Sequence, residues 1–328
     1  MISRFCEIIT ENFHDIANGV FSKNSSSSDE QLNIKMMSIA TNWMCNLRCE
    51  ICDIWKKKDK TILSPSLLRA SLQSPFFDNV ECVGFFGGET TLHPALPELM
   101  QVIKDRFGIN AAIVTNGYGK HIPDIFNNLK DFNPLICVSI DGQKNVHDIR
   151  RGKKGSYEDA LRTLARANDL FSQKPRISFT VLPDTVNELS HILELAKKFN
   201  TDISMRAGVS GSYFGGKSNE KWSEHDIKQL EDQLSNIPDS FLTNPFFVRD
   251  IPEFLRSGKV KIQCKAAYNI LVVDPDMNTR ICHSLEPICK LADVPKNWGK
   301  HPEWKAAKNG RCFKRECFID GPYSTSWF

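Results

Sequence analysis

Three cysteines stand close together in the sequence, at Cys45, Cys49 and Cys52, with no fourth cysteine nearby. This C-x3-C-x2-C spacing suits an iron–sulfur cluster, which thiolates hold. A cubane cluster has four irons, so three thiolates leave one iron without a protein ligand. An open coordination position distinguishes a reactive metal centre from a closed structural one. The alternatives are a structural zinc site, which normally takes four ligands in short paired spacings, and a chance grouping.

The cysteine triplet resembles the signature of the radical S-adenosylmethionine (SAM) superfamily. The resemblance implies that Cys45, Cys49 and Cys52 hold a [4Fe–4S] cluster and take part in catalysis. It also implies that SAM chelates the open iron, and that the reduced cluster cleaves SAM to methionine and a 5′-deoxyadenosyl radical. That radical then abstracts a hydrogen atom from the substrate. The sequence departs from the family at Ile51, where an aromatic residue is usual, although isoleucine can still pack against adenine.

Further motifs that resemble family elements follow in the expected order. Gly87, Gly88 and Glu89 match the family's glycine-glycine-glutamate motif. Glycine lets a backbone approach the ligand closely, and the glutamate can accept hydrogen bonds from the methionine ammonium of SAM. Thr115 and Asn116 precede a glycine and match another common element, which either contacts SAM or is an ordinary turn between a strand and a helix.

Two more motifs lie between residues 139 and 152. Ser139 opens a Ser-Ile-Asp-Gly run, and His147 opens a His-Asp-Ile-Arg-Arg-Gly run. Both resemble elements of the branch of the family that carries C-terminal extensions. By that resemblance Ser139 contacts the ribose or carboxylate of SAM, and either Arg150 or Arg151 pairs with the carboxylate, a task that suits the planar, permanently charged guanidinium. We expect His147 to brace its loop rather than to transfer protons.

A second group of cysteines lies near the C-terminus. The segment from Cys264 to Cys282 contains a turn at residues 274–278 between two β-like runs, and it resembles the opening hairpin of SPASM and twitch extensions. The family usually has glycine in this turn, whereas this sequence has Met277 and Asn278, and we expect the asparagine to take the left-handed conformation. The resemblance implies the shorter twitch arrangement, with Cys289 in reserve and an auxiliary [4Fe–4S] cluster on Cys264, Cys282, Cys312 and Cys317. A zinc site on four of the five cysteines is the alternative.

The chain around these motifs alternates short apolar runs with longer helix-like segments. The apolar runs predict strands at residues 36–41, 82–86, 111–115, 135–140, 176–183 and 202–207. Helix-like segments such as 96–107 and 189–199 separate them, which indicates βαβ units and a parallel sheet. Six such units predict an α/β fold, a partial (β/α)6 TIM-like barrel with a small C-terminal cysteine-rich extension of twitch or SPASM type. Because each motif follows a strand, the motifs should gather at one mouth of the barrel.

Changes in composition suggest four parts of the chain. Residues 1–35 predict an amphipathic helix and a flexible serine-rich tether, and residues 36–215 the radical SAM core. Residues 216–255 predict a helical linker, and residues 256–328 the auxiliary-cluster extension. The remaining cysteines, Cys6, Cys82 and Cys137, lie in helical or strand-like runs and are interpreted as small buried hydrophobic residues.

The overall composition excludes several classes of protein. Hydrophobic residues make up 41% and charged residues 25% of the 328, as in an ordinary globular protein. No run approaches the roughly 20 apolar residues of a membrane helix, and no signal-peptide core is present. We therefore expect a cytoplasmic protein without membrane attachment, whose eleven cysteines serve as metal ligands more readily than as disulfides. A formal net charge of +3 is too small to indicate nucleic-acid binding.

Two features of the sequence bear on its partners. The dense basic run at residues 56–60 is either a solvated loop or a docking place for an acidic electron donor of the flavodoxin or ferredoxin type. Residues 1–35 are too short for a leader-binding domain, so oxidation or rearrangement of a small-molecule or natural-product substrate is slightly favoured over crosslinking, epimerisation or dehydrogenation of a ribosomally made peptide. A non-catalytic iron–sulfur electron-transfer protein or zinc-binding protein is the alternative of another class, but it would leave the ordered motifs unexplained.

Overall fold

The computed structural model describes residues 33–208, 214, 221–259, 266–283, 285–302 and 304. They all belong to one compact unit, Asn33–Phe328. Within these residues a nine-stranded sheet has the order β6-β5-β4-β3-β2-β1-β7-β8-β9. Six neighbouring strands of the sheet are parallel and follow chain order: β1 (Met36–Ala40), β2 (Cys82–Phe86), β3 (Ala112–Thr115), β4 (Leu135–Ser139), β5 (Arg176–Val181) and β6 (Asp202–Ala207).

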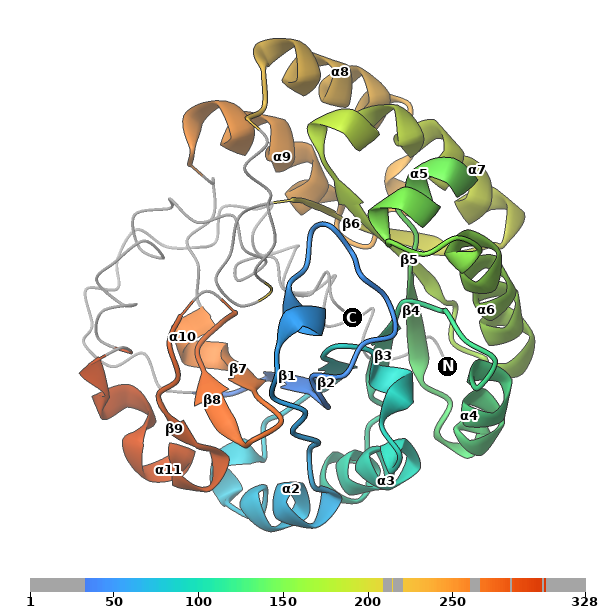
Figure 1. Ribbon diagram of the computed structural model, residues 1–328. Helices are drawn as coiled ribbons and strands as arrows, with labels where there is room; N and C mark the ends of the chain where they lie inside the picture. Colours follow the sequence, from blue (N-terminus) through green and yellow to red (C-terminus); the bar gives the residue numbers. More distant parts are fainter. Residues whose placement is uncertain are drawn as a thin grey trace. The chain divides into compact units, whose positions relative to one another are not determined.

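Helices connect these strands and surround them on the outside (Figure 1). They are α2 (Pro65–Ser71), α3 (Leu96–Phe107), α4 (Ile122–Asn128), α5 (Lys144–Arg150), α6 (Ser156–Leu170) and α7 (Leu189–Lys198). A parallel strand pair needs such a crossover connection, which is usually a helix. The sheet does not close, because β6 ends it while β1 pairs with β2 and β7. The predicted partial (β/α)6 barrel is therefore confirmed.

Helix α3 shows how the sequence specifies one of these elements. Its buried positions recur at the spacing of one helical face and include Leu96, Leu99, Met100 and Ile103. Pro97 stands in the first turn, where its missing N–H costs no helical hydrogen bond. Gly108 follows the last turn with a φ of 69°, the left-handed conformation that commonly ends a helix.

The two faces of the parallel sheet differ in chemistry. Ile39, Ile177 and Ile203 are fully buried and lie on one face, as the strand registers show. Ser38, Ser178 and Ser204 alternate with them and lie on the other face. Parallel strands covered on both sides normally have continuous apolar sequences. The polar second face therefore indicates the side of the sheet on which to look for function.

The C-terminal part of the chain joins the same sheet. After α8 (Glu224–Ser235), α9 (Pro245–Ser257) and α10 (Ala266–Asn269), strand β7 (Ile270–Val273) pairs with β1 in parallel. The antiparallel strands β8 (Asn278–Arg280) and β9 (Cys289–Lys290) complete the sheet, and α11 (Val294–Asn297) follows. The helices in the described ranges are all too short or too polar to cross a membrane.

The hairpin of β7 and β8 has the predicted place but not the predicted turn. Met277 carries the left-handed conformation, with a φ of 69°, so the prediction that Asn278 would do so is wrong. Asn278 already belongs to β8, where its carbonyl accepts from the Asp274 N–H at 2.8 Å. Its side-chain amide donates to Asp276 Oδ2 at 2.5 Å, which ties the asparagine to the turn rather than placing it at the bend.

Candidate active site

The structure brings the sequence motifs together at one edge of the sheet. The cysteine loop, residues 41–53, follows β1, and residues 87–89 follow β2. Thr115 ends β3, and Ser139 ends β4. Because the carboxyl ends of neighbouring parallel strands meet at one edge, these segments become neighbours in space.

Gly87 and Gly88 let the chain after β2 lie directly against the cysteine loop. The N–H of Gly88 donates to the Asn42 carbonyl at 2.8 Å, and the N–H of Glu89 donates to the Met44 carbonyl at 2.7 Å. A Cβ atom on Gly88 would lie 2.0 Å from the Met44 carbonyl oxygen, and one on Gly87 would lie 2.5 Å from that of Asn42. Gly87 also has a φ of 143°, which side chains disfavour. The glycines therefore permit a close approach of backbone to backbone just before Cys45.

Glu89 joins the ends of β2 and β3 through a buried carboxylate. Its Oε1 accepts from the Thr91 N–H at 3.0 Å, the Thr91 hydroxyl at 2.7 Å and the Thr115 hydroxyl at 2.7 Å. Its Oε2 accepts from the Asn116 N–H at 2.7 Å. The residue is only 1% exposed, so these bonds replace the water that would otherwise solvate the charge. Glu89 thus fixes the position of Asn116.

Asn116 in turn holds the cysteine loop. Its side-chain Nδ2 donates to Asn46 Oδ1 at 2.8 Å and lies 3.9 Å from Cys45 Sγ. The side-chain Nδ2 of Asn46 donates to the Tyr118 carbonyl at 2.6 Å. The sequence motifs pointed to Asn116 but not to Asn46, whose only signal was its place beside Cys45.

The chain after α5 supports the cysteine loop from another side. The N–H of Arg48 donates to the Arg151 carbonyl at 3.2 Å, and the N–H of Glu50 donates to the Arg150 carbonyl at 3.0 Å. A Cβ atom on Gly152 would lie 2.5 Å from the Arg48 carbonyl oxygen, so this contact also depends on a glycine. The two loops therefore share backbone hydrogen bonds on both sides of Cys49.

The side chains of the two arginines diverge. Arg151 Nη1 lies 4.0 Å from Cys49 Sγ, and Arg151 Nε lies 2.7 Å from Asp141 Oδ2. Arg150 pairs with Asp184 and lies 3.7 Å from the Glu50 carboxylate. Arg151 therefore lies against the cysteine loop, and Arg150 lies against surface carboxylates.

His147 and Asp148 organise the loop between β4 and α6. The N–H of Asp141 donates to His147 Nδ1 at 3.2 Å, which confirms the prediction that this histidine braces its loop. Burial lowers the pKa of His147 to about 4, helped by the nearby Arg151, so the ring is neutral. Asp148 accepts from the N–H groups of Gly155 and Tyr157 at 2.8 and 2.9 Å and so fixes the start of α6.

The three cysteines of the loop are free thiols, of which Cys49 is buried and Cys45 and Cys52 are half-buried. Burial raises the pKa of Cys45 to about 12 and that of Cys52 to about 11. It also raises the pKa of Cys49, although Arg151 counteracts the effect in part. At neutral pH the metal-free thiols are therefore protonated, and binding a metal must release protons.

The donor set fits a cubane better than a single ion. A structural zinc ion normally takes four protein ligands, whereas three thiolates leave one iron of a cubane without a protein ligand. Hydrogen bonds to ligand sulfurs tune such clusters, and Asn116 and Arg151 direct N–H groups toward Cys45 and Cys49. The three thiols therefore fit a [4Fe–4S] cluster with one open iron.

The other cysteines divide into three groups. Cys82 and Cys137 are buried within β2 and β4, which confirms their interpretation as small hydrophobic residues. Cys282 and Cys289 are half-buried, and Cys289 Sγ lies 3.7 Å from the Thr279 hydroxyl. The four that lie outside the described residues are Cys6, Cys264, Cys312 and Cys317.

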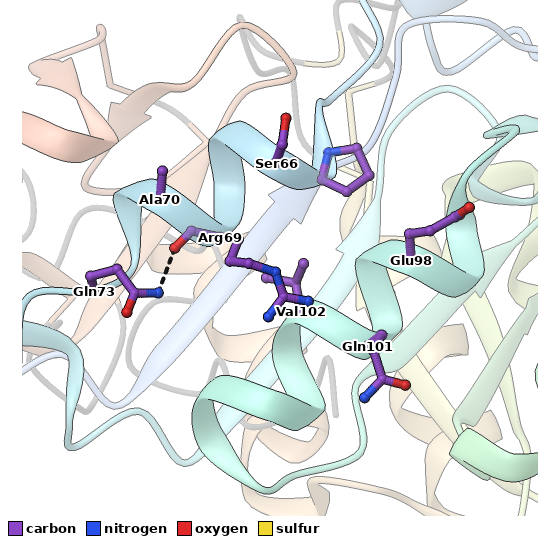
Figure 2. Close-up of a pocket in the computed structure, with 8 residues that line it drawn as sticks. Ser66, Arg69, Ala70, Gln73, Glu98, Gln101 and Val102 are labelled. Atoms are coloured by element: carbon purple, nitrogen blue, oxygen red, sulfur yellow. Dashed lines mark hydrogen bonds between the residues drawn. The ribbon is translucent and has the colours of Figure 1, made fainter.

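A separate surface pocket lies between α2 and α3 (Figure 2). It is lined by Pro65, Ser66, Arg69, Ala70, Gln73, Glu98, Gln101 and Val102. The Gln73 side chain donates to the Arg69 carbonyl at 2.8 Å, and Arg69 pairs with Asp105 at 2.8 Å. The lining contains no thiol or histidine, so this pocket is not the site of the predicted chemistry.

Residues 44–199 match the family model described as the radical SAM superfamily, which uses a [4Fe–4S] cluster and SAM. Among curated proteins, the chain is 26% identical over 204 residues to the sporulation killing factor maturation protein SkfB of Bacillus subtilis (strain 168), a match that covers 62% of this chain and 48% of SkfB. It is 29% identical over 160 residues to the Fe-coproporphyrin III synthase of Methanosarcina barkeri (strain Fusaro / DSM 804), which covers 47% of this chain and 39% of the synthase. The chain thus spans less than half the length of both relatives.

Among solved structures, the fold resembles that of Streptococcus suis SuiB bound to its precursor peptide SuiA. The TM-score is 0.65 at 15% sequence identity, and the match covers 92% of this chain and 80% of SuiB. At this identity the likeness concerns the fold. The match therefore covers more of the chain than residues 44–199.

Proposed function

Because residues 44–199 form a domain of the radical SAM superfamily, we propose that this protein uses a cluster on Cys45, Cys49 and Cys52 to cleave SAM reductively. One observation carries the proposal: three free thiols share one loop, and N–H donors from Asn116 and Arg151 reach toward two of them. When bound, the cluster supplies the electron that converts SAM into methionine and a 5′-deoxyadenosyl radical, which abstracts a hydrogen atom from the substrate.

Arg151 and Asn116 are proposed to stabilise the thiolates that the cluster requires. The thiols are buried or half-buried, and an anion withdrawn from water needs an opposite charge or a hydrogen bond. Arg151 provides a positive charge beside Cys49, held in place by Asp141. Asn116 provides an amide N–H beside Cys45. Asn46 and Asp141 hold these two groups in position beside the sulfurs.

Glu89, Ser139 and one of the two arginines are proposed to hold SAM. Three donors occupy Glu89 Oε1, whereas Oε2 accepts from the Asn116 N–H alone among the described donors. A carboxylate oxygen has two lone pairs, so Oε2 retains capacity for the methionine ammonium. Since Arg151 faces Cys49, which the cluster occupies, it is the better placed arginine for the carboxylate of SAM at the open iron. The site is supported by the close backbone approach at Gly87 and Gly88 and by the hydrogen bond that the Thr115 hydroxyl donates to Glu89.

We propose a peptide substrate ahead of a small molecule. The curated relative SkfB is named as a maturation protein, and the structure of SuiB holds a precursor peptide. These two relatives reverse the slight preference for a small molecule that the sequence motifs alone gave. A small-molecule substrate remains the second candidate, since Fe-coproporphyrin III synthase matches a comparable part of the chain.

The auxiliary cluster remains a proposal on Cys264, Cys282, Cys312 and Cys317, with Cys289 in reserve. Cys282 lies two residues after β8 and Cys289 is the first residue of β9, in a sheet that continues from β1 through β7. Strand β1 leads directly into the cysteine loop, so this part of the chain is linked to the proposed SAM site through the sheet. The division at residues 36–215, 216–255 and 256–328 stays part of the same proposal.

Anaerobic reconstitution followed by a SAM-cleavage assay with dithionite tests the function. Wild type should release 5′-deoxyadenosine, and the Cys45→Ala, Cys49→Ala, Cys52→Ala variant should not. Equal yields from the two proteins would refute the proposal. Iron analysis should give about eight irons per chain for two cubane clusters, whereas about four irons and one zinc would refute the auxiliary cluster. Transfer of deuterium from a labelled precursor peptide to 5′-deoxyadenosine would establish the substrate class.

A further inference from the structure

An exposed basic surface lies on the cysteine loop and the segment that follows it. We define it by four exposed side chains, Arg48, Lys56, Lys58 and Lys60. Lys57, in the same run, is excluded because it is half-buried with its Nζ 3.6 Å from the centre of the Trp43 ring. Four cations on one short stretch form a local positive field. At 0.1 M salt the Debye length is about 10 Å, so an approaching partner experiences this field within about that distance.

The acidic residues of the same stretch, Glu50, Asp53 and Asp59, offset its positive charge only in part, because five lysine and arginine residues stand against them. Glu50 lies 3.7 Å from Arg150, which is outside the basic surface. Asp59 accepts from the N–H of Thr61 at 2.8 Å and from its hydroxyl, and its charge offsets part of that of Lys57 and Lys60. Asp53 lies 2.5 Å from Lys56 and offsets that one lysine. Arg48, Lys58 and Lys60 form no ion pair with a described carboxylate.

Trp55 connects the basic surface to a cluster ligand. The indole Nε1 donates to the Cys49 carbonyl at 3.2 Å. The guanidinium carbon of Arg48 lies 5.3 Å from the centre of the Trp55 ring, and Lys56 Nζ lies 5.1 Å from it. Such distances suit cation–π contacts, so two cations of the surface contact the ring. A partner protein that contacts the Trp55 ring is therefore separated from Cys49 by that ring and one hydrogen bond.

We propose that the basic surface docks an acidic one-electron carrier protein of the flavodoxin or ferredoxin type, and that Trp55 forms the contact closest to Cys49. The inference rests on the proposed function, which requires one electron from outside the chain for each SAM cleaved. The reduced carrier is oxidised by one electron, and the cluster gains that electron. Opposite charges steer such partners together, and complexes of redox proteins are typically small and weak, so a compact basic surface suffices.

The test measures binding of reduced flavodoxin to the anaerobically reconstituted full chain. The first variant, Lys56→Glu, Lys58→Glu, Lys60→Glu, reverses three charges of the surface. The control variant, Lys130→Glu, Lys197→Glu, Lys198→Glu, reverses three exposed charges in the segments that lead into β4 and β6, at the opposite edge of the sheet. SAM cleavage is measured with flavodoxin and, separately, with dithionite, which is small enough to need no docking surface.

We expect the first variant to bind flavodoxin about tenfold or more weakly at low ionic strength and to lose most of the salt dependence of Kd. Flavodoxin-driven cleavage should fall to a similar extent, whereas the control variant should match wild type. Equal effects in the two variants, or none in the first, would overturn the proposal. Loss of dithionite-driven cleavage in the first variant alone would also overturn it, because damage to the cysteine loop would then explain the result. Absence of dithionite-driven cleavage in wild type would instead refute the proposed function.

Discussion

Arg151 directs a guanidinium nitrogen at Cys49, with 4.0 Å between Nη1 and Sγ. Its Nε lies 2.7 Å from Asp141, and the two side chains are only 11% and 3% exposed. Burial opposes the charged form of Arg151, but Asp141 and the Cys49 sulfur outweigh it and raise the pKa of the guanidinium. A permanent positive charge therefore stands beside one proposed cluster ligand.

Replacing Arg151 should make the cluster harder to reduce. Reduction adds negative charge, which a nearby cation and an N–H donor to sulfur stabilise. We expect Arg151→Gln to lower the reduction potential by on the order of tens of millivolts. The measurement is a redox titration followed by electron paramagnetic resonance, without SAM. Arg150→Gln removes the same charge one position away but faces Asp184, so its potential should stay near that of wild type. Equal shifts in both variants would contradict a specific role for Arg151.

Gly88→Ala should disrupt the cysteine loop. The added Cβ would lie 2.0 Å from the Met44 carbonyl oxygen, and neither backbone segment can move without losing its hydrogen bonds. We expect a loss of about 3 kcal/mol or more in the free energy of unfolding, together with loss of iron binding. Denaturant unfolding and iron analysis of the reconstituted protein measure both effects.

The matched control for that prediction is Gly108→Ala at the end of α3. Gly108 also has a positive φ, of 69°, but an added Cβ would meet no atom within 4 Å. Only the backbone preference is then lost, which costs about 1 kcal/mol. Iron content should stay unchanged. If both variants retained iron equally, the close approach at Gly88 would not be essential to the site.

The sequence predicted those features that depend on neighbouring residues. Strand β2 was expected at residues 82–86 and spans Cys82–Phe86, because an unbroken apolar run that ends in two glycines fixes both its type and its end. Helix α3 was expected at residues 96–107 and spans Leu96–Phe107 for similar reasons of periodicity and capping. The cysteine loop, likewise, was recognisable from spacing within eight residues.

Features that depend on distant partners could not be predicted. Asn46 contacts Asn116 across 70 positions, and Arg151 contacts Cys49 across 102, so no local pattern signals either pair. Local preference also misled at the turn before β8, where asparagine is the better left-handed residue but Met277 adopts that conformation. Asn278 is part of strand β8 and pairs with β9, so strand pairing outweighs the preference of asparagine for the left-handed conformation.

Glu89→Gln should loosen the link between β3 and the cysteine loop. The amide oxygen can replace Oε1, which takes three donors, but the NH2 group then faces the Asn116 N–H. An unsatisfied buried donor costs about 1–3 kcal/mol, and the shift of Asn116 should weaken SAM binding. Glu98→Gln, at an exposed position of α3, is the control with the same chemical change. Denaturant unfolding and equilibrium SAM binding should separate the two variants, and indistinguishable results would remove Glu89 from the site.

His147 should make the protein less stable in mild acid. Its pKa is lowered to about 4 by burial and by Arg151, against the opposing effect of Asp141 and Asp148, and Tyr157 packs against the ring. The unfolded chain binds a proton below its ordinary pKa of about 6.5, whereas the folded chain binds none until about pH 4. The contribution of this group is therefore complete above pH 6.5 and falls as the pH decreases toward 4.

We expect the free energy of unfolding to fall by roughly 2 kcal/mol between pH 6.5 and 5 on account of this histidine. The other described histidine with a strongly lowered pKa, His283 at about 3, acts in the same direction, so wild type must be compared with a variant at position 147. His147→Asn keeps an acceptor for the Asp141 N–H but cannot titrate. The stability difference between the two proteins should shift in favour of the variant as the pH falls, because only wild type loses this contribution. Parallel stability curves would show that the ring is protonated in the folded protein, and that Asp141 and Asp148 outweigh burial at this position.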